Sequence, residues 1–235
     1  MNGIQTGPVT VTAPRHASRA TREVGRATRA ALLEAAAGMF AEHGLGGVSL
    51  TEIAAAADAF PSQVTYYFGS KEALFVEGAC RDLLRVASAV EAAGHQAATP
   101  EAYVRAIVDT AVASPGLLVF VEAMLLARRR PDLAPLVAKT FRRLHAEGER
   151  AVAETLVRRE WALRASPATE ARAFWATVLG VALERAATAD DYDAETAAAA
   201  VLLVLNFYPE ARPQEPEATA GRRRRPAPRE IRRTR

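Results

Sequence analysis

The sequence has little of what several classes of protein require. Only one of the 235 residues is cysteine, Cys80, which excludes an intramolecular disulfide framework and a cysteine-cluster zinc site. Aromatic residues make up 6% of the chain, and this scarcity argues against a sandwich, a barrel or a doubly wound sheet. No apolar run approaches the roughly 20 residues that span a bilayer, and Arg, His and Pro interrupt the N-terminal stretch where a secretory signal would lie. We therefore expect a soluble, intracellular protein without a membrane partner.

Alanine, by contrast, occupies 53 positions. Because alanine is the strongest helix former, this composition predicts an all-α fold. Apolar residues recur at helical spacing through most of the chain, with glycine and proline near the ends of the periodic segments. The pattern predicts helices over residues 28–43, 49–57, 61–68, 71–93, 100–113, 116–128, 131–161, 167–188 and 194–208.

The formal net charge of +3 conceals an uneven distribution. Residues 1–30 hold five Arg and one Glu (net +4), and residues 209–235 hold nine Arg and four Glu (net +5). The other 16 basic and 22 acidic side chains leave residues 31–208 with a net charge of −6. Basic ends on an acidic helical body are typical of attraction to a polyanion. Neither end buries enough apolar surface to offset its ordering entropy, so we expect residues 1–27 and 209–235 to be disordered.

Three helices near the N-terminus carry the strongest functional signal. Gly44 follows the first of them, where a left-handed C-cap is needed. Ser49 stands three residues before Glu52, which is the spacing of a capping box at the start of the second helix. Pro61 suits the first position of the third helix. Two short helices joined by a tight turn form a shape that fits the major groove of B-DNA.

The third helix has side chains suited to reading bases. Val64 and Phe68 are four residues apart and are predicted to anchor one face of this helix. A glutamine pairs well with adenine, hydroxyl groups reach bases or phosphates, and a threonine methyl can contact thymine. Lys71 and the N-terminus of the next helix can hold a phosphate. The alternative is that the tyrosines are scaffold and the glutamine is only solvated. The candidate contact residues on this helix are Ser62, Gln63, Thr65, Tyr66 and Tyr67.

An ordered set of short motifs runs from Thr28 to Phe75. They are Leu32-Leu33 with Ala35-Ala36, Met39-Phe40 with Gly44, Ser49 with Glu52-Ile53-Ala54, and Val64 with Tyr66-Tyr67-Phe68 and Ser70-Lys71-Glu72-Ala73-Leu74. In these motifs the stretch resembles the DNA-binding domain of the TetR family of transcriptional regulators. The resemblance implies a three-helix helix-turn-helix domain over 28–74 and a larger all-helical ligand-binding and dimerisation domain over 75–208.

The resemblance also implies that the third helix enters the major groove and that Ser49 caps the second helix. Two positions depart from the family pattern. The turn is Asp58-Ala59-Phe60 in place of Gly, a small apolar residue and Ser, so Phe60 leaves the third helix without a side-chain cap, while Asp58 still tolerates a left-handed turn. Thr65 stands where Tyr is common, which should alter base preference. The positions that match the family's base and phosphate contacts are Thr51, Pro61, Ser62, Gln63, Thr65, Tyr67 and Lys71.

The C-terminal region is expected, by the same resemblance, to bind a small molecule and to dimerise. A mostly apolar pocket for a small, apolar ligand is predicted among the middle helices, with ordinary packing as the alternative for each residue. Its candidate residues are Tyr103, Phe120, Met124, Phe141, His145, Trp161 and Trp175. The last two helices are predicted to pair with their copies in a four-helix bundle. The candidate interface residues are Phe174, Thr177, Val178, Gly180, Val181, Val201, Leu202 and Leu205, with Ala173 and Ala176 allowing close approach.

The basic ends have less definite interpretations. The N-terminal arm is predicted to follow an adjacent minor groove or the phosphates, with a merely solubilising tail as the alternative. The run Arg222–Arg225 could add nonspecific DNA affinity, bind RNA or keep the protein soluble. The arginines of the N-terminal arm are Arg15, Arg19, Arg22, Arg26 and Arg29.

An enzyme is the main alternative from another class, and the residues do not favour it. The four histidines lack metal-ligand spacing, the Gly44–Gly47 segment does not follow a strand, and Cys80 has no evident base partner. We therefore expect no catalytic site, metal or cofactor. A helical ligand-binding or adaptor protein that has lost DNA binding is a second alternative, left open by Asp58 and Phe60. The resemblance implies a bacterial, cytoplasmic and nucleoid-associated homodimeric repressor that binds a palindromic double-stranded DNA operator and responds to a ligand.

Overall fold

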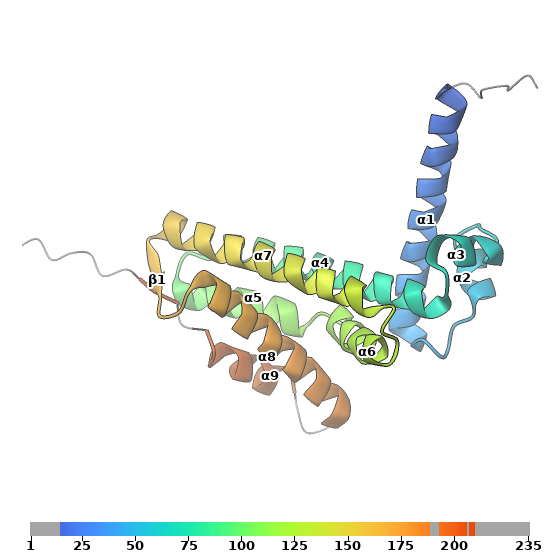
Figure 1. The fold of residues 1–235 in the computed structure, drawn as a ribbon. Coiled ribbons are helices and arrows are strands. Elements are labelled where there is room, and N and C mark those ends of the chain that lie inside the picture. Colours follow the sequence, from blue (N-terminus) through green and yellow to red (C-terminus); the bar gives the residue numbers. More distant parts are fainter. Residues whose placement is uncertain (1–14, 189–192, 206, 210–235) are drawn as a thin grey trace, which may run out of the picture.

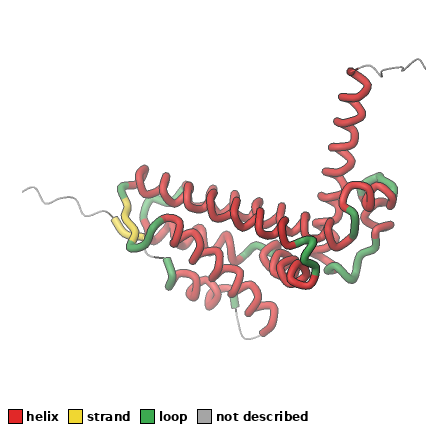
Figure 2. The backbone as a smooth tube through the Cα atoms, viewed as in Figure 1, coloured by secondary structure: helices red, strands yellow, loops and turns green. Residues whose placement is uncertain are grey.

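The computed structural model describes residues 15–188, 193–205 and 207–209, which form nine helices and two short strands (Figure 1). Helices account for nearly all of the regular structure, so the predicted all-α class is confirmed (Figure 2). The elements are α1 (Arg15–His43), α2 (Leu50–Ala56), α3 (Pro61–Phe68), α4 (Lys71–His95), α5 (Pro100–Val112), α6 (Gly116–Arg129), α7 (Ala134–Arg159), β1 (Trp161–Leu163), α8 (Pro167–Thr188), α9 (Ala194–Leu202) and β2 (Phe207–Pro209).

The helices form two units that meet at α4. The C-terminal half of α1 packs with α2 and α3 in the smaller unit, and α5 to α9 form the larger body (Figure 1). α4 begins against α1 and α3 and continues between α5, α6 and α7. The N-terminal half of α1 extends away from both units (Figure 1).

Local side-chain chemistry explains where the helices of the smaller unit begin and end. Ser49 Oγ accepts the backbone N–H of Glu52 at 3.2 Å, and the Glu52 carboxylate accepts the backbone N–H of Ser49 at 2.8 Å. The predicted capping box is therefore confirmed. Gly44 ends α1 with φ +66°, and Asp58 turns the chain between α2 and α3 with φ +48°, both in the left-handed region as predicted.

A continuous hydrophobic core joins the two units. It runs from Leu32 and Ile53 in the smaller unit, through Phe75 on α4, to Phe120 and Val178 in the body, and each of these side chains is at most 1% exposed. Full burial of one such side chain contributes roughly 1.5–3 kcal/mol. Because α4 lies in the middle of this core, its packing is shared by both units.

The start of α1 differs from the prediction. The helix begins at Arg15 and not at Thr28, so the arm expected to be disordered is helical from Arg15 onward. Residues 15–27 contain no proline and add turns to a helix that is already anchored, which avoids a new nucleation step. Residues 1–14 and the tail 210–235, including Arg222–Arg225, lie outside the described residues.

Two helix ends also differ from the prediction. The helix expected over 131–161 ends at Arg159, because Glu160 takes a left-handed conformation with φ +54°. The helix expected over 194–208 ends at Leu202. The segments that follow these two helix ends pair as antiparallel strands β1 and β2, with Leu163 opposite Phe207. Short apolar runs satisfy helical and extended patterns equally well, so periodicity alone does not separate them.

The described residues contain no single helix that is long and apolar enough to cross a membrane. α5 and α6 reach that length and composition only as a pair, bent by 62°. The bend falls at Ser114 and Pro115, between the two helices.

Two helical glycines provide a matched test of this packing. A Cβ on Gly94 of α4 would lie 2.6 Å from Tyr103 and 3.0 Å from Ile107, whereas a Cβ on Gly38 of α1 would meet no atom within 4 Å. We expect Gly94→Ala to lower the free energy of unfolding by about 1–3 kcal/mol through overpacking. Gly38→Ala should raise it by about 0.5–1 kcal/mol. Urea denaturation measures both, and equal effects would contradict the close approach of α4 and α5.

Candidate nucleic-acid interface and ligand cavity

α3 has one buried face and one exposed face. Val64 and Phe68 are buried, so the predicted anchor is confirmed. Ser62, Thr65 and Tyr66 are exposed, and Tyr66 has 81% of its surface open to solvent. The hydroxyl groups of Ser62 and Thr65 and the ring of Tyr66 are therefore accessible to the major groove of DNA, as the predicted contact role requires.

The residues around the start of α2 and α3 are exposed as well. Ser49 and Thr51 lie in the first turn of α2, and Pro61 is the first residue of α3. Phe60, at the N-cap of α3, is 73% exposed and makes no side-chain capping bond, as the sequence predicts.

Gln63 supplies the second half of a capping box at the start of α3, in which the third helical residue bonds back to the N-cap residue. Its Oε1 accepts the backbone N–H of Phe60 at 2.9 Å. One lone pair of the amide oxygen is therefore engaged within the protein, while the amide N–H groups remain donors for a purine acceptor. The half-buried Gln63 thus serves the fold and the candidate interface together.

Lys71 is held in place by the loop before α2. Its Nζ donates to the backbone carbonyl of Val48 at 2.8 Å. An ammonium group carries three donors, so two remain for a phosphate oxygen. Ser70 caps the same helix by accepting the N–H of Ala73 at 3.1 Å. Tyr67 is half-buried, and its ring meets that of Tyr66 edge-on at 5.0 Å.

Ion pairs tie α1 to α4 behind this surface. Arg29 lies 2.6 Å from Glu77, and its guanidinium stands 4.7 Å from the ring centroid of Phe68. Arg85 lies 2.7 Å from Glu34, and its hydrogen bond lowers the pKa of the Glu34 carboxyl. Exposed pairs contribute about 1 kcal/mol or less each, so their main effect is to fix the orientation of α1 on α4.

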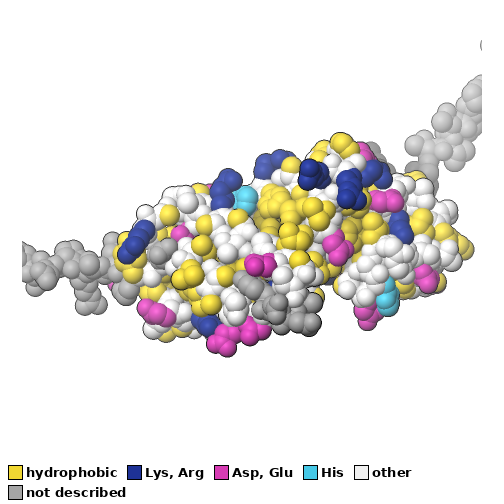
Figure 3. Space-filling model, turned by 90° about the horizontal axis from the view of Figure 1, so that it is seen from below, with side chains coloured by type: hydrophobic (Ala, Val, Ile, Leu, Met, Phe, Trp, Pro, Cys, Tyr) yellow, Lys and Arg dark blue, Asp and Glu magenta, His cyan; other side chains and the backbone are white. Residues whose placement is uncertain are grey.

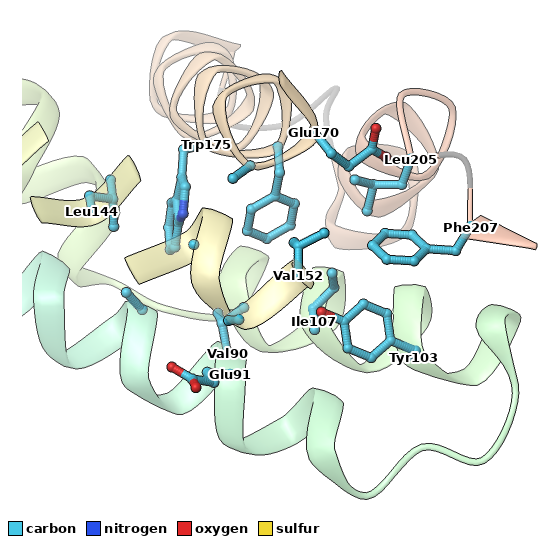
Figure 4. A pocket seen from close by; sticks show the side chains of 15 residues that line it. Val90, Glu91, Tyr103, Ile107, Leu144, Val152, Glu170, Trp175, Leu205 and Phe207 are labelled. Carbon is cyan, nitrogen blue, oxygen red and sulfur yellow. The ribbon is translucent and has the colours of Figure 1, made fainter. Parts of the chain in front are cut away.

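The body contains a cavity of about 60 Å³ (Figure 4). Tyr103 and Phe207 lie side by side at one end, with ring centroids 5.0 Å apart, and Trp175 and Leu144 lie at the other end (Figure 4). α4, α5, α7, α8 and the segment after α9 all contribute to the wall. The lining residues are Ala87, Val90, Glu91, Tyr103, Ile107, Leu144, Gly148, Ala151, Val152, Glu170, Ala171, Phe174, Trp175, Leu205 and Phe207.

Two of the seven predicted pocket residues, Tyr103 and Trp175, line this cavity. Phe120 is instead fully buried in the neighbouring core, where its ring lies 5.4 Å from that of Phe141. α6 packs against α4 and α8 without reaching the cavity wall, so its one aromatic residue, Phe120, serves the core. The cavity does not include the other five predicted residues, Phe120, Met124, Phe141, His145 and Trp161.

The polar groups of the cavity wall are few. Burial raises the pKa of Tyr103, so its hydroxyl is neutral at physiological pH. Glu91 is paired with Arg150 at 3.2 Å, and Glu170 is 3% exposed. Among the described residues, no Lys, Arg or His lines the wall. Neither glutamate was predicted, because no local signal in the sequence distinguishes a glutamate beside a cavity from one on the solvated surface.

The predicted dimer interface needs correction. Phe174 and Leu205 line the cavity, and Val178, Val181 and Val201 are buried within the protomer. These five side chains are therefore not free to meet a second copy. The apolar side of α8 is turned inward onto α5, α6, α7 and α9, which explains the difference.

Of the predicted interface residues, Gly180 is exposed, while Thr177 and Leu202 are half-buried. Ala176 is exposed on the same side of α8, and Leu183 is 47% exposed. On the underside of the molecule, hydrophobic side chains gather in the middle, with Lys and Arg along one border (Figure 3). The outward side of α8 thus offers small residues together with one exposed leucine.

The residues weighed for catalysis have unreactive surroundings. Cys80 is buried, as expected for a packing residue, and burial raises the pKa of its thiol. A protonated thiol is a poor nucleophile. Within the described part of the chain, no group of three or more His, Cys, Asp or Glu is placed to hold a metal ion.

Comparison with known families identifies both parts of the chain. Residues 32–77 match the family described as bacterial regulatory proteins, tetR family. Residues 100–205 match the family described as bacterial transcriptional repressor C-terminal. No curated protein matches the chain significantly.

Solved structures support the same assignment. A protein assigned as a transcriptional regulator from Rhodococcus sp. RHA1 is 42% identical, with a TM-score of 0.69, and the match covers 76% of this chain and 95% of that one. SmeT in complex with triclosan is 25% identical, with a TM-score of 0.53 and coverage of 80% and 98%. The multidrug binding protein EbrR in complex with imidazole is 26% identical, with a TM-score of 0.51 and coverage of 79% and 98%. This chain therefore belongs to the TetR family of bacterial transcriptional regulators, as its helix-turn-helix residues predict.

Proposed function

We propose that two copies of this chain bind a near-palindromic operator through α3, and that a small molecule in the cavity beside Trp175 releases the DNA. TetR regulators bind DNA as dimers, respond to small molecules and are generally not enzymes. The single observation that carries the proposal is the course of α4. Its first turn holds Lys71 at the candidate interface, and further along it Ala87 and Val90 line the cavity.

The size of the cavity determines how a ligand would act. Binding sites for small molecules are typically about 300–1,000 Å³, whereas this cavity measures about 60 Å³. A ligand must therefore displace some of the walls, and α4 is one of them. At 1.5 Å per residue, the 25 residues of α4 form a lever about 37 Å long.

The far end of that lever is fixed to the DNA-reading unit. The bond from Lys71 to the Val48 carbonyl and the pair between Arg29 and Glu77 tie the loop before α2 and α1 to α4. α3 packs against both α1 and α4, so it follows the same movement. In a dimer, this motion changes the separation of the two α3 helices, which must match one DNA turn of about 34 Å. By linkage, the ligand then binds the DNA-incompetent spacing more tightly, and operator DNA weakens ligand binding by the same factor.

The cavity wall defines the class of ligand. Four aromatic side chains and several aliphatic ones line it, with a neutral tyrosine hydroxyl and two carboxylates as its main polar groups. Such a wall favours a compact, mostly apolar or aromatic molecule without negative charge. SmeT in complex with triclosan and EbrR in complex with imidazole each hold an aromatic molecule, which supports this class of ligand.

A dimer is proposed to form through the outward side of α8. Ala176 and Gly180 are exposed there, and small residues allow two helices to approach closely. α9 lies beside α8 and adds the exposed Leu203. A twofold contact would place these helices against their copies in a four-helix bundle.

Gln63→Glu tests DNA reading without removing the cap of α3. The carboxylate retains an acceptor for the Phe60 N–H but loses the amide donors and adds negative charge. A good base contact is worth about 1–3 kcal/mol, so affinity for an operator selected from random DNA should fall about tenfold or more while the melting temperature is retained. The matched control is Gln96→Glu, at the exposed C-cap of α4. Equal effects of the two variants on operator affinity would contradict base contact by α3.

The two tryptophans report separately on the cavity. Trp175 lines it and Trp161 does not, so Trp161→Phe leaves a single tryptophan, which lies in the wall and can be excited selectively. A neutral aromatic compound that weakens operator binding, with triclosan the first to be tried, should quench the fluorescence of Trp161→Phe. The same compound should quench Trp175→Phe less, because its remaining Trp161 lies behind Tyr103 and outside the wall, and it should still release the operator. Quenching confined to Trp161 would place the ligand elsewhere.

Gly180→Glu tests the dimer. A Cβ at Gly180 would meet no atom within 4 Å beyond the neighbouring backbone of its own helix, so the fold should tolerate a side chain there while a charge in the proposed interface separates the subunits. Gly38→Glu has the same open surroundings on α1 and is the control. Sedimentation at micromolar concentration should find monomers for the first variant and dimers for the second. A dimeric Gly180→Glu protein would exclude this side of α8 as the interface.

A further inference from the structure

Phe60 places an aromatic ring at the start of α3. It is the N-cap residue of this helix, and 73% of its surface is exposed. The anchoring of α3 does not depend on it, because Val64 and Phe68 are the side chains of this helix that are buried in the core. The ring of Phe60 is therefore available to a partner without any change in the packing of the protein.

Backbone restraints fix the chain at Phe60 on both sides. The Phe60 N–H donates to Gln63 Oε1 at 2.9 Å, and the Phe60 carbonyl accepts the N–H of Gln63 at 2.9 Å. Asp58 sets the direction of the turn with φ +48°. Residue 60 has the extended backbone that the following Pro61 favours, with φ −97° and ψ 146°. None of these restraints uses the Phe60 side chain, so the ring can be replaced while the start of α3 keeps its geometry.

The position of Phe60 brings its ring toward the edges of the bases. In a helix-turn-helix complex, the N-terminal residues of the second helix contact base edges in the major groove. Phe60 directly precedes Pro61 and Ser62, which are both exposed and both candidate contacts. DNA bound to α3 in the proposed mode therefore passes beside the ring.

The chemistry of the ring determines which base it suits. The base pairs present hydrogen-bond donors and acceptors in the major groove, and the C5-methyl of thymine is the distinctive apolar group there. A phenyl ring cannot replace the water that it displaces from a donor or an acceptor, and an unpaired polar group is costly to bury. Contact with the thymine methyl buries apolar surface on both partners and is therefore favourable.

We propose that Phe60 contacts a thymine methyl and selects thymine at one position in each half-site, the part of the operator that one copy of α3 reads. This inference rests on the proposed function and assigns one base of the operator. It also accounts for the departure of the turn from the family pattern. Phenylalanine in place of serine gives up a capping hydroxyl, and the base contact is what the exchange gains.

Uracil substitution in the operator tests this contact, because uracil differs from thymine only in lacking the C5-methyl. Each thymine of an operator selected from random DNA is replaced in turn, symmetrically in both half-sites, and affinity is measured for the unchanged chain and for Phe60→Ser. At one position, uracil should weaken binding by the unchanged chain about fourfold per half-site, or about fifteenfold for both, as expected for the loss of one buried methyl each. Phe60→Ser should bind the thymine and uracil forms of that position equally.

Three variants control for other effects of the substitution. Serine is a preferred N-cap residue, so Phe60→Ser should keep α3 folded, and its melting temperature checks this. Phe60→Leu keeps an apolar side chain and should retain part of the preference for thymine over uracil. Val157→Ala truncates an apolar side chain that is 84% exposed on α7, in the body, and should retain the whole preference.

The preference for thymine over uracil separates this inference from the proposed function. If Phe60→Ser kept the full preference at every position, the methyl contact would be overturned. A loss of affinity that is the same for all thymine and uracil forms would indicate a contact with the DNA backbone and would overturn it as well. In both cases base reading by α3 would survive if Gln63→Glu still lowered the ratio of operator to scrambled-DNA affinity. A chain that selects no operator from random DNA would contradict the proposed function, and this inference with it.

Discussion

The packing of α4 against both units is the constraint on which the rest of the structure depends. Its N-terminal turn is bound to the loop before α2 through Lys71, and Glu77 holds α1 through Arg29. Further along, Val90 and Glu91 form part of the cavity wall. One helix therefore contacts both the candidate DNA interface and the wall of the candidate ligand cavity. A helix of this length transmits a displacement because its backbone hydrogen bonds resist local compression.

Because the cavity is small, a ligand that enters it is expected to displace the helices that form its wall, α4 among them. A body whose cavity already accommodated a ligand would have little reason to move when the ligand arrives. Here the walls close around about 60 Å³, and aromatic rings from α5, α8 and β2 fill the space between the helices. Close-packed interiors respond to added volume by shifting whole elements, not by yielding locally. The same packing that stabilises the empty body makes it responsive to a ligand.

The sequence predicts α3 in full and much else only in part. Pro61 and Gly69 mark both ends of α3, and the cap of Ser49 marks the start of α2, so local chemistry suffices there. No glycine or capping residue directly precedes Arg15, where α1 begins. The N-terminal extension of α1 is therefore not predicted, because nothing in its composition distinguishes a projecting helix from a disordered arm. Phe120 and Phe174 both lie within apolar helical segments of the sequence, yet Phe120 packs in the core and Phe174 lines the cavity. Which helix faces meet is decided by tertiary packing, which periodicity does not contain.

The separation of the two DNA-reading units tests the central claim most directly. Ala55 is exposed on α2, and the lone natural cysteine is buried, so Ala55→Cys accepts one spin label per protomer. Pulsed electron resonance then measures the distance between the labels in the free dimer, with operator, and with a releasing ligand. We expect a narrow distribution with operator, set by the turn of about 34 Å between half-sites, and a shift to a different distance with ligand. An identical distance in the two complexes would contradict transmission through α4.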